Sequence, residues 1–342
     1  MKAVTMHQHG GLEVLRLESL PDPEVGAGQV LVRVRAVALN HLDIFVRQGW
    51  PGLRLSFPHV LGADVAGVVE SVGPGVTGAV EGDEVVVNPG ISCGRCRACL
   101  SGDDPMCSGY SVLGEHVPGG YAEHLIVPMQ NVLRKPKNLS FDEAACVPVV
   151  FLTAWHALVS RAGARVGETV LIHAAGSGVG SAAIQIARLI GATVIATAGS
   201  DAKCERALAL GAHHAVNYAR QDFKKEVRRI TARRGVDVVF EHVGKATWEK
   251  SLLVLARGGR LVTVGATTGH DPVTDLRHVF YRSLSILGST MGSKGELFQV
   301  LSLVETGKLA PVLDRVLPLA EAAAAQKLME DRTLFGKIVL NP

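Results

Sequence analysis

Four of the six cysteines lie within fifteen residues of one another, in the spacing Cys-x2-Cys-x2-Cys-x7-Cys: Cys93, Cys96, Cys99 and Cys107. Four thiolates so close in sequence can surround one tetrahedral Zn²⁺ ion. A set of four protein ligands leaves no open coordination position, so we expect the metal to be structural. Two alternatives stay open, an iron–sulfur cluster, which thiolates also hold, and thiols without a metal.

A glycine-rich turn, His173-Ala-Ala-Gly-Ser-Gly-Val-Gly-Ser181, stands between a strand pattern and a helix pattern. Glycine lets a backbone approach a pyrophosphate closely, and the start of the following helix offers free N–H groups. This pattern therefore predicts a dinucleotide site whose contacts come from Gly176, Ser177, Gly178, Val179 and Gly180. The alternative is a tight strand–helix turn without a ligand.

The next strand pattern ends in Ala198-Gly199-Ser200, where NAD enzymes usually carry the acidic residue that binds the ribose. Asp201 follows as the expected helix cap, and Lys203 lies in the first turn. A hydroxyl and an ammonium suit a 2′-phosphate, so we expect NADPH to be preferred, with NADH possible. In the alternative, Asp201 binds the ribose and Lys203 is a surface charge.

The elements that must position these residues change in type along the chain. Up to about residue 140, short alternating strands such as Gln29–Ala38 are separated by Gly and Pro turns, which is typical of a mainly antiparallel, barrel-like domain. From Glu168, apolar strands alternate with helices, which predicts an α/β domain with a doubly wound parallel sheet. The last strand pattern, Lys337–Leu340, has no place in that alternation, so we expect it to return to the first domain. The predicted domains are therefore 1–147 with 292–342, and 148–291.

Composition excludes other classes of protein. The net charge is only +3, the basic residues are spread along the chain, and aromatic content is 5%, so we expect no nucleic-acid partner. The two longest uncharged stretches, 144–160 and 169–187, are interrupted by Pro148, His156, His173 and glycines, so we expect no membrane partner. No apolar signal region opens the sequence, and we expect a cytoplasmic location.

Together these features resemble the zinc-type medium-chain dehydrogenase/reductase superfamily, which includes alcohol dehydrogenases and quinone oxidoreductases. The resemblance covers essentially the whole chain. It rests on the cysteine cluster, the glycine turn and six further segments, which are Leu61–Gly73, Gly82–Val86, Gly119–Glu123, Leu152–Trp155, Gly235–Val239 and Gly258–Val262. It implies a GroES-like catalytic domain with a zinc lobe at about 90–110, a Rossmann domain, a small-molecule substrate, and a homodimer or homotetramer.

Departures from the family pattern concern the catalytic zinc, which alcohol dehydrogenases hold by Cys, His and Cys with a Glu beside the His. The first Cys position is Asn40, the Gly-His-Glu position reads Gly62-Ala63-Asp64, and the third ligand position is Val149. The relay hydroxyl is replaced by Leu42. Asn40 at the first Cys position resembles the zinc-independent quinone and enoyl reductases. The resemblance thus implies a hybrid, with the structural zinc kept, the catalytic zinc lost, and Asn40 and Asp64 as catalytic candidates.

The resemblance also bears on the coenzyme and the reaction. Lys203 and Tyr218 match a Lys and a Tyr that surround the 2′-phosphate in NADPH-using quinone reductases, and Thr153 and Gly265 are expected near the nicotinamide. The first hypothesis is hydride transfer to an activated C=C bond or a quinone, with Asn40 donating a hydrogen bond to the developing oxyanion. The second is a zinc-dependent alcohol dehydrogenase with ligands rebuilt from Asp64, His41 or Cys146. The third is a non-enzymatic NADPH-binding regulator.

Overall fold

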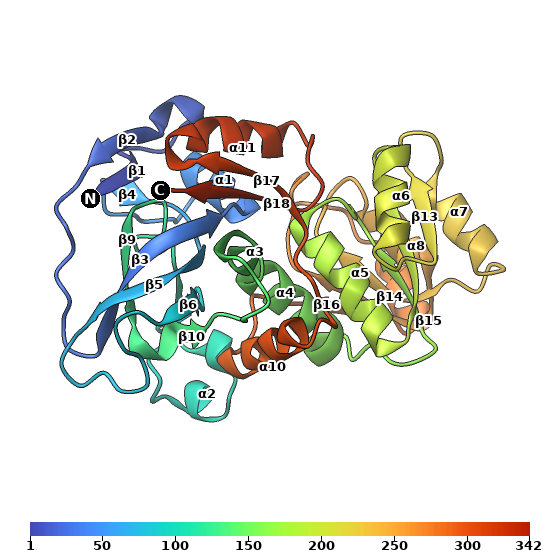
Figure 1. Cartoon of the computed structure of the whole chain (residues 1–342). Helices are drawn as coiled ribbons and strands as arrows, with labels where there is room; N and C mark the ends of the chain where they lie inside the picture. The colour runs from blue at the N-terminus through green and yellow to red at the C-terminus, as the bar shows by residue number, and fades with distance from the viewer. The chain divides into compact units, whose positions relative to one another are not determined.

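The computed structural model describes all 342 residues, and the chain divides into two units (Figure 1). Unit 1 comprises Met1–Val149 and Gly292–Pro342, and unit 2 comprises Val150–Met291. The chain passes from unit 1 into unit 2 within helix α4 (Pro148–Trp155). None of the helices has both the length and the apolar character needed to cross a lipid bilayer.

A seven-stranded sheet forms the centre of unit 1, and strand β3 (Gln29–Ala38) is its longest member. The alternation of Val with Arg in β3 buries Val30, Val32 and Val34 and leaves Arg33 and Arg35 exposed, as the sequence predicted. Strand β3 pairs in antiparallel fashion with three strands, β5 (Asp64–Val72), β9 (His124–Pro128) and the C-terminal β18 (Lys337–Asn341). The sheet is completed by β6 (Glu84–Val87), β10 (Val132–Arg134) and β17 (Leu313–Pro318). The pairing of β18 with β3 confirms that the C-terminal strand returns to the N-terminal sheet (Figure 1).

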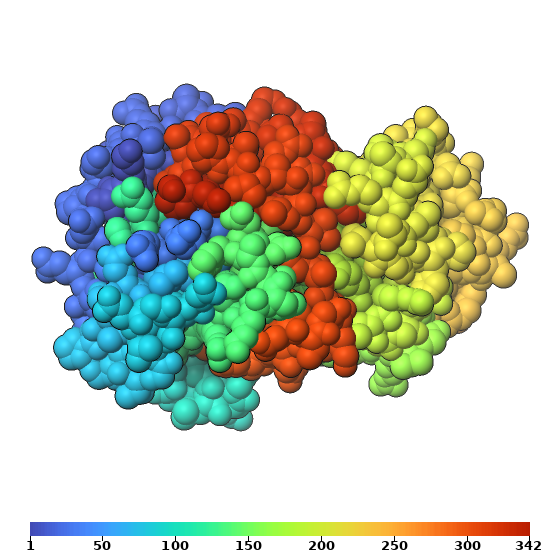
Figure 2. Space-filling view, in the orientation of Figure 1, coloured from blue at the N-terminus to red at the C-terminus, as the bar shows by residue number.

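Shorter elements surround this sheet in unit 1. The remaining strands are β1 (Lys2–Met6), β2 (Arg16–Ser19), β4 (His59–Val60), β7 (Gly90–Ile91) and β8 (Ser111–Val112). The helices are α1 (His41–Gln48), α2 (Arg97–Leu100), α3 (Phe141–Ala145), α10 (Lys294–Glu305) and α11 (Ala322–Glu330). Buried Arg47 of α1 forms an ion pair with Glu330 of α11. The space-filling view accordingly shows the C-terminal segment, in red, against the N-terminal residues, in blue (Figure 2).

Unit 2 contains a six-stranded, fully parallel sheet in the order β13-β12-β11-β14-β15-β16. Its strands are β11 (Thr169–Ile172), β12 (Thr193–Ala198), β13 (His214–Asn217), β14 (Val236–Glu241), β15 (Leu255–Thr263) and β16 (Ser285–Gly288). The connecting helices are α5 (Gly178–Ile190), α6 (Asp201–Ala209), α7 (Phe223–Ile230), α8 (Trp248–Val254) and α9 (Leu276–Tyr281). Three consecutive residues of β11, Val170 to Ile172, are fully buried, so both faces of the sheet are covered. The predicted α/β architecture is confirmed.

Strand order in unit 2 determines where a ligand would bind. The chain builds β11, β12 and β13 outward in one direction and then resumes with β14 on the other side of β11. In such sheets the ligand crevice lies beyond the carboxyl ends of the strands where the order reverses, here β11 and β14. The glycine turn follows β11, and buried Glu241 ends β14.

Candidate functional site

The glycine turn leads directly from β11 into α5. Ser177 caps the helix, its hydroxyl accepting a hydrogen bond from Gly180 N at 2.9 Å. A Cβ on Gly180 would lie 2.4 Å from the carbonyl oxygen of Ala174, so no larger residue fits there. Because Ser177 is the N-cap and α5 begins at Gly178, the N–H groups of Gly178 and Val179 lie in the first turn of the helix. These are the groups that hold a pyrophosphate at a helix N-terminus.

A buried polar network fixes the loops beside this turn, and sequence reasoning missed it. The Glu241 carboxylate accepts hydrogen bonds from Val243 N at 2.7 Å, Gly244 N at 3.0 Å and the hydroxyl of Ser251 at 3.0 Å. The Ser251 hydroxyl also contacts His173 Nε2 at 2.9 Å. Burial lowers the pKa of His173 to about 4, so the imidazole is neutral at pH 7. In the sequence, the feature that could have indicated this network is a carboxylate at the end of a Val-rich strand, before Gly244.

The two residues expected near the nicotinamide both lie in unit 2. Gly265 follows β15, and a Cβ built on it would lie 3.4 Å from the His242 carbonyl oxygen. His242 in turn donates from Nε2 to the carbonyl oxygen of His173, at the start of the glycine turn, at 2.8 Å. Thr153 lies in α4 and is buried. The structure therefore connects Gly265 with the turn through His242.

Three residues expected around the coenzyme 2′-phosphate converge at the end of β12. Ser200, rather than Asp201, caps α6, and its hydroxyl accepts from Lys203 N at 3.3 Å. Tyr218 follows β13, and its hydroxyl lies 2.8 Å from the position of a Cβ on Gly199. The Asp201 carboxylate is held by Asn217 Nδ2 at 2.6 Å and by Arg220 at 2.5 Å. Asp201 is thus engaged with neighbouring side chains.

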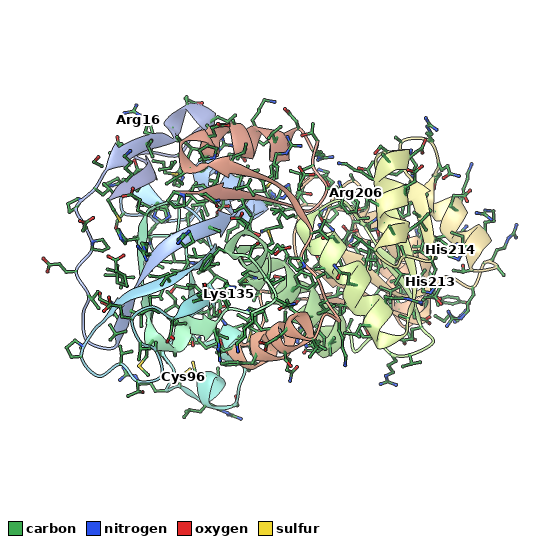
Figure 3. All side chains as sticks on the ribbon, in the orientation of Figure 1. Arg16, Cys96, Lys135, Arg206, His213 and His214 are labelled. Carbon is green, nitrogen blue, oxygen red and sulfur yellow. The ribbon has the colours of Figure 1, made fainter.

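The four cysteines lie together in a lobe around α2 in unit 1, and Figure 3 labels Cys96 there. Their sulfur atoms all lie within 4.8 Å of one another, with Cys93–Cys99 at 3.9 Å and Cys96–Cys99 at 3.5 Å. A tetrahedral site with Zn–S bonds of about 2.3 Å puts its sulfurs ~3.8 Å apart, so the cluster fits zinc. The backbone N–H groups of Arg95 and Cys96 lower the pKa of Cys93 to about 6, which favours the thiolate.

The two catalytic candidates of the sequence analysis contact each other in unit 1. Asn40 Nδ2 donates to Asp64 Oδ2 at 2.9 Å, and both side chains are buried. Lys337, at the start of β18, donates from Nζ to Asn40 Oδ1 at 2.6 Å and to Asp64 Oδ2 at 2.9 Å. The ammonium fixes the amide orientation, because a flipped amide would put its NH₂ group against Nζ. The other oxygen of Asp64 accepts from Val149 N at 2.7 Å.

Asn40 has less free hydrogen-bonding capacity than the sequence analysis assumed. One amide hydrogen is used by Asp64, and the other points to the carbonyl oxygen of Ala38 at 3.4 Å, which is a long contact. Lys337 was missed by sequence reasoning; a lysine opening an apolar strand, in Gly336-Lys337-Ile338, was the available signal.

Asp43 completes the buried cluster and also escaped the sequence analysis. Its carboxylate accepts from Asn40 N at 2.8 Å, the Tyr121 hydroxyl at 3.1 Å and Gly62 N at 3.2 Å. Burial raises the pKa of Asp43 to about 6 despite these donors. Asp43 thereby joins the start of α1 to the turn before β5, the two segments that carry Asn40 and Asp64.

Comparison with known proteins agrees with this geometry. Residues 26–137 match the alcohol dehydrogenase GroES-like domain, and residues 178–306 match the zinc-binding dehydrogenase family. An NAD-dependent alcohol dehydrogenase of Sulfolobus acidocaldarius is 35% identical, covering 99% of each chain. The chain belongs to the zinc-type medium-chain dehydrogenase/reductase superfamily. It is an NAD(P)-dependent oxidoreductase.

Two further members of the superfamily illustrate its range. Human quinone oxidoreductase is 31% identical, over 99% of this chain and 97% of its own. A solved structure described as an NAD-dependent alcohol dehydrogenase is 54% identical, covers both chains completely and superposes with a TM-score of 0.97. Proteins of this medium-chain dehydrogenase/reductase superfamily are therefore named after more than one reaction.

Proposed function

We propose that this medium-chain dehydrogenase/reductase transfers a hydride from NADPH to a conjugated C=C bond or a quinone, without a metal ion at the reacting centre. The observation that carries the proposal is the buried cluster of Asn40, Asp64 and Lys337. Asn40 stands at the position of the first zinc ligand of the superfamily's alcohol dehydrogenases, Asp64 stands at the position of the Glu beside their His ligand, and Lys337 contacts both.

Residues at those positions do not suit a metal. Asn40, Ala63 and Val149 replace the three expected ligands, and neither Ala nor Val has a donor atom in its side chain. Both oxygens of Asp64 already accept hydrogen bonds, one of them from an ammonium at 2.9 Å that would repel a cation. The four cysteines are the one group of three or more ligating side chains that comes together in the chain.

The cluster offers a hydrogen-bond donor in place of the metal. Bound NADPH supplies a hydride, and its addition to a conjugated acceptor develops negative charge on the remote oxygen. The ammonium of Lys337 at Asn40 Oδ1 polarises the amide and strengthens its N–H groups as donors. The N–H in long contact with Ala38 O is the one left to donate to the substrate oxygen, while Asp64 holds the other. Asp64 also balances the charge of Lys337.

A second candidate, alcohol oxidation, is favoured by the name of the 54% identical solved structure. The two candidates separate in one experiment on purified protein. We expect one zinc per chain and NADPH-dependent reduction of a simple enone or quinone. Two zincs per chain, with oxidation of a primary alcohol and no enone or quinone reduction, would reject the proposal in favour of the alcohol dehydrogenase.

The proposed preference for NADPH rests on the residues at the end of β12. Ser200, Lys203 and Tyr218 gather there, and Asp201 is engaged with Asn217 and Arg220. The acid at that position is therefore engaged in an ion pair, while Lys203 offers a cation that suits a phosphate.

The zinc of the cysteine lobe is proposed to be structural. Four thiolates complete a tetrahedral shell, so the ion would hold the lobe together and leave no position for a substrate. A small-molecule substrate, a homodimer or homotetramer, and a cytoplasmic location stay predictions.

A further inference from the structure

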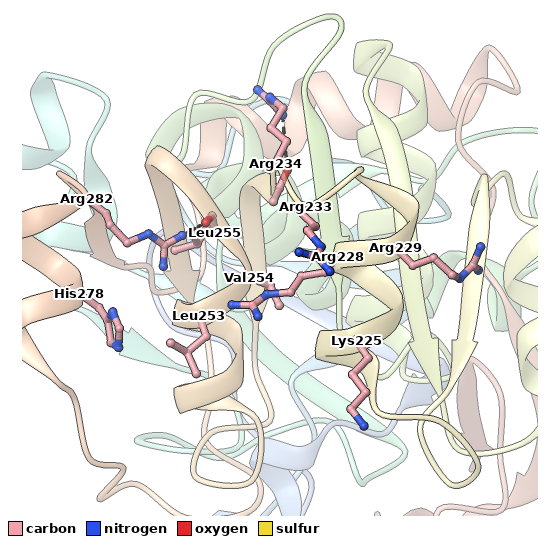
Figure 4. A pocket seen from close by; sticks show the side chains of 11 residues that line it. Lys225, Arg228, Arg229, Arg233, Arg234, Leu253, Val254, Leu255, His278 and Arg282 are labelled. Atoms are coloured by element: carbon pink, nitrogen blue, oxygen red, sulfur yellow. Dashed lines mark hydrogen bonds between the residues drawn. The ribbon is translucent and has the colours of Figure 1, made fainter.

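Unit 2 contains a basic cavity of about 750 Å³ away from the glycine turn (Figure 4). It is bordered by the end of α7, the following loop, the end of α8, and α9 with Arg282. We call it the arginine cavity. The side chains in its wall that could contact a ligand include Lys225, Arg228, Arg233, Leu253, His278 and Arg282. The size is that of a small-molecule site.

The arginine cavity lies at the opposite edge of the sheet from the coenzyme turn. Gly235, in its wall, immediately precedes β14, whereas the glycine turn follows the carboxyl end of β11. Strands β11 and β14 are parallel neighbours, so the start of one lies at the far edge from the end of the other. The cavity is therefore separate from the proposed coenzyme site.

Positive charge in the cavity is not balanced by the protein. Its wall includes six Lys or Arg residues and no acid. Two of the six are paired, Arg229 with Glu226 at 2.9 Å and Arg234 with Asp237 at 2.5 Å, and Figure 4 shows both side chains directed away from the cavity. Lys225, Arg228 and Arg233 form no ion pair.

Structural roles account for some of these cations but not for all. The Arg282 guanidinium donates to the carbonyl oxygens of Leu252 and Leu255 at the end of α8, and Arg228 lies in the last turn of α7, where a cation is favourable. The pKa of Arg282 is lowered first by burial and then by the positive charge of Arg228. The two arginines therefore repel each other in the ligand-free protein.

The backbone that places Arg233 beside Arg228 is strained. Ala232 and Arg233 are consecutive non-glycine residues with φ of +47° and +66°. Arg233 N donates to the carbonyl oxygen of Arg228 at 2.6 Å, which fixes the two arginines next to each other. Strain of this kind is typical of functional positions, and a glycine would have avoided it.

We propose that the arginine cavity binds a small molecule carrying two or more linked phosphate groups. Arg228 and Arg233 present guanidinium groups whose planar donors match phosphate oxygens, Lys225 and His278 border them, and Leu253 offers an apolar surface to the rest of the ligand. A bound polyphosphate would relieve the repulsion among the arginines. A concave site of this size, in a chain with a net charge of only +3, favours a small molecule over nucleic acid.

Calorimetric titration with inorganic tripolyphosphate tests the proposal, with and without saturating coenzyme. We expect the same affinity in both cases, because the two sites lie at opposite sheet edges. We expect the Arg228→Gln/Arg233→Gln double variant to bind at least tenfold more weakly. The matched control, Arg229→Gln/Arg234→Gln, removes the same charge from paired residues and should bind within twofold of wild type.

A single variant separates a loss of binding from a loss of folding. Arg233→Gly removes the guanidinium and relieves the strained backbone, so we expect normal thermal unfolding with weakened tripolyphosphate binding. No binding by wild type, equal losses in both double variants, or displacement of tripolyphosphate by coenzyme would overturn the proposal. So would tighter binding of a single-stranded oligonucleotide that the Arg228→Gln/Arg233→Gln variant abolishes.

Discussion

Lys337 Nζ lies 2.6 Å from Asn40 Oδ1, although the two residues are 297 positions apart in the sequence. The pairing of β18 with β3 produces this contact, because it brings the last strand of the chain beside the strand that leads to Asn40. The discontinuity of unit 1 thus supplies the cation of the proposed catalytic cluster. The chemistry of this cluster depends on the return of the C-terminal segment.

Loss of the Lys337 charge should destabilise unit 1. Lys337→Met leaves the fully buried Asp64 carboxylate without its cation, and breaking a buried pair on one side typically costs about 3–5 kcal/mol. Urea unfolding measures the effect. Replacing both partners, in Lys337→Met/Asp64→Asn, should recover part of the loss, and a double variant as unstable as the sum of two single changes would contradict the pairing.

Removal of one cysteine ligand should lower the zinc content and the stability of the protein but leave its affinity for the coenzyme unchanged. In Cys99→Ser we expect the zinc content to fall well below one per chain and the melting temperature to drop, because the lobe loses a tetrahedral ligand. NADPH affinity should stay within about twofold, since the lobe lies in unit 1 and the glycine turn in unit 2. Cys204→Ser, outside the cluster, is the matched control. Wild-type protein stripped of its metal that still melts at the same temperature would contradict a structural zinc.

Coenzyme choice should depend on Lys203. Losing a charged contact to the 2′-phosphate costs about 1.5–3 kcal/mol, or roughly tenfold to hundredfold in affinity. Lys203→Ala should therefore bind NADPH and NADH about equally, while Lys308→Ala, an exposed change in unit 1, should leave the preference intact. Fluorescence titration with both coenzymes gives the ratio. A wild-type protein that prefers NADH would contradict the assignment and shift the ribose contact to Asp201.

Acid should destabilise the protein through His173. Burial lowers the pKa of His173 in the folded state to about 4, whereas an unfolded histidine titrates near pH 6.5. Between these values the unfolded chain holds more protons, so the free energy of unfolding decreases as the pH falls from about 6.5 to 4. His173→Gln should flatten this dependence, and the exposed His270→Gln should not. Identical pH profiles for wild type and His173→Gln would contradict the buried, neutral imidazole.

The sequence was sufficient to predict those features that are encoded locally. Apolar runs such as Val170–Ile172 predicted the parallel sheet, and the cysteine spacing predicted a cluster that the structure brings together. Each of these depends on neighbours in the chain or on a fixed periodicity.

Long-range polar contacts were not predictable in the same way. The partners of Asn40 depend on strand pairing across almost the whole chain, and nothing near Lys337 in sequence identifies it as the neighbour of Asp64. The cap of α6 was assigned to Asp201 rather than Ser200, because both residue types suit an N-cap and only the backbone conformation distinguishes them. The Glu241 network likewise joins residues from separate strands and helices.

In the proposed reaction Asn40, and not a metal, stabilises the oxyanion. The most direct measurement compares the kcat for reduction of an enone by NADPH in wild type, Asn40→Ala and the exposed control Asn138→Ala, alongside oxidation of a primary alcohol with and without added zinc. Removing one oxyanion donor typically costs about a hundredfold or more in turnover. We predict that loss for Asn40→Ala alone, with zinc having no effect. Zinc-dependent alcohol oxidation, with no enone reduction by the wild type, would contradict this role of Asn40.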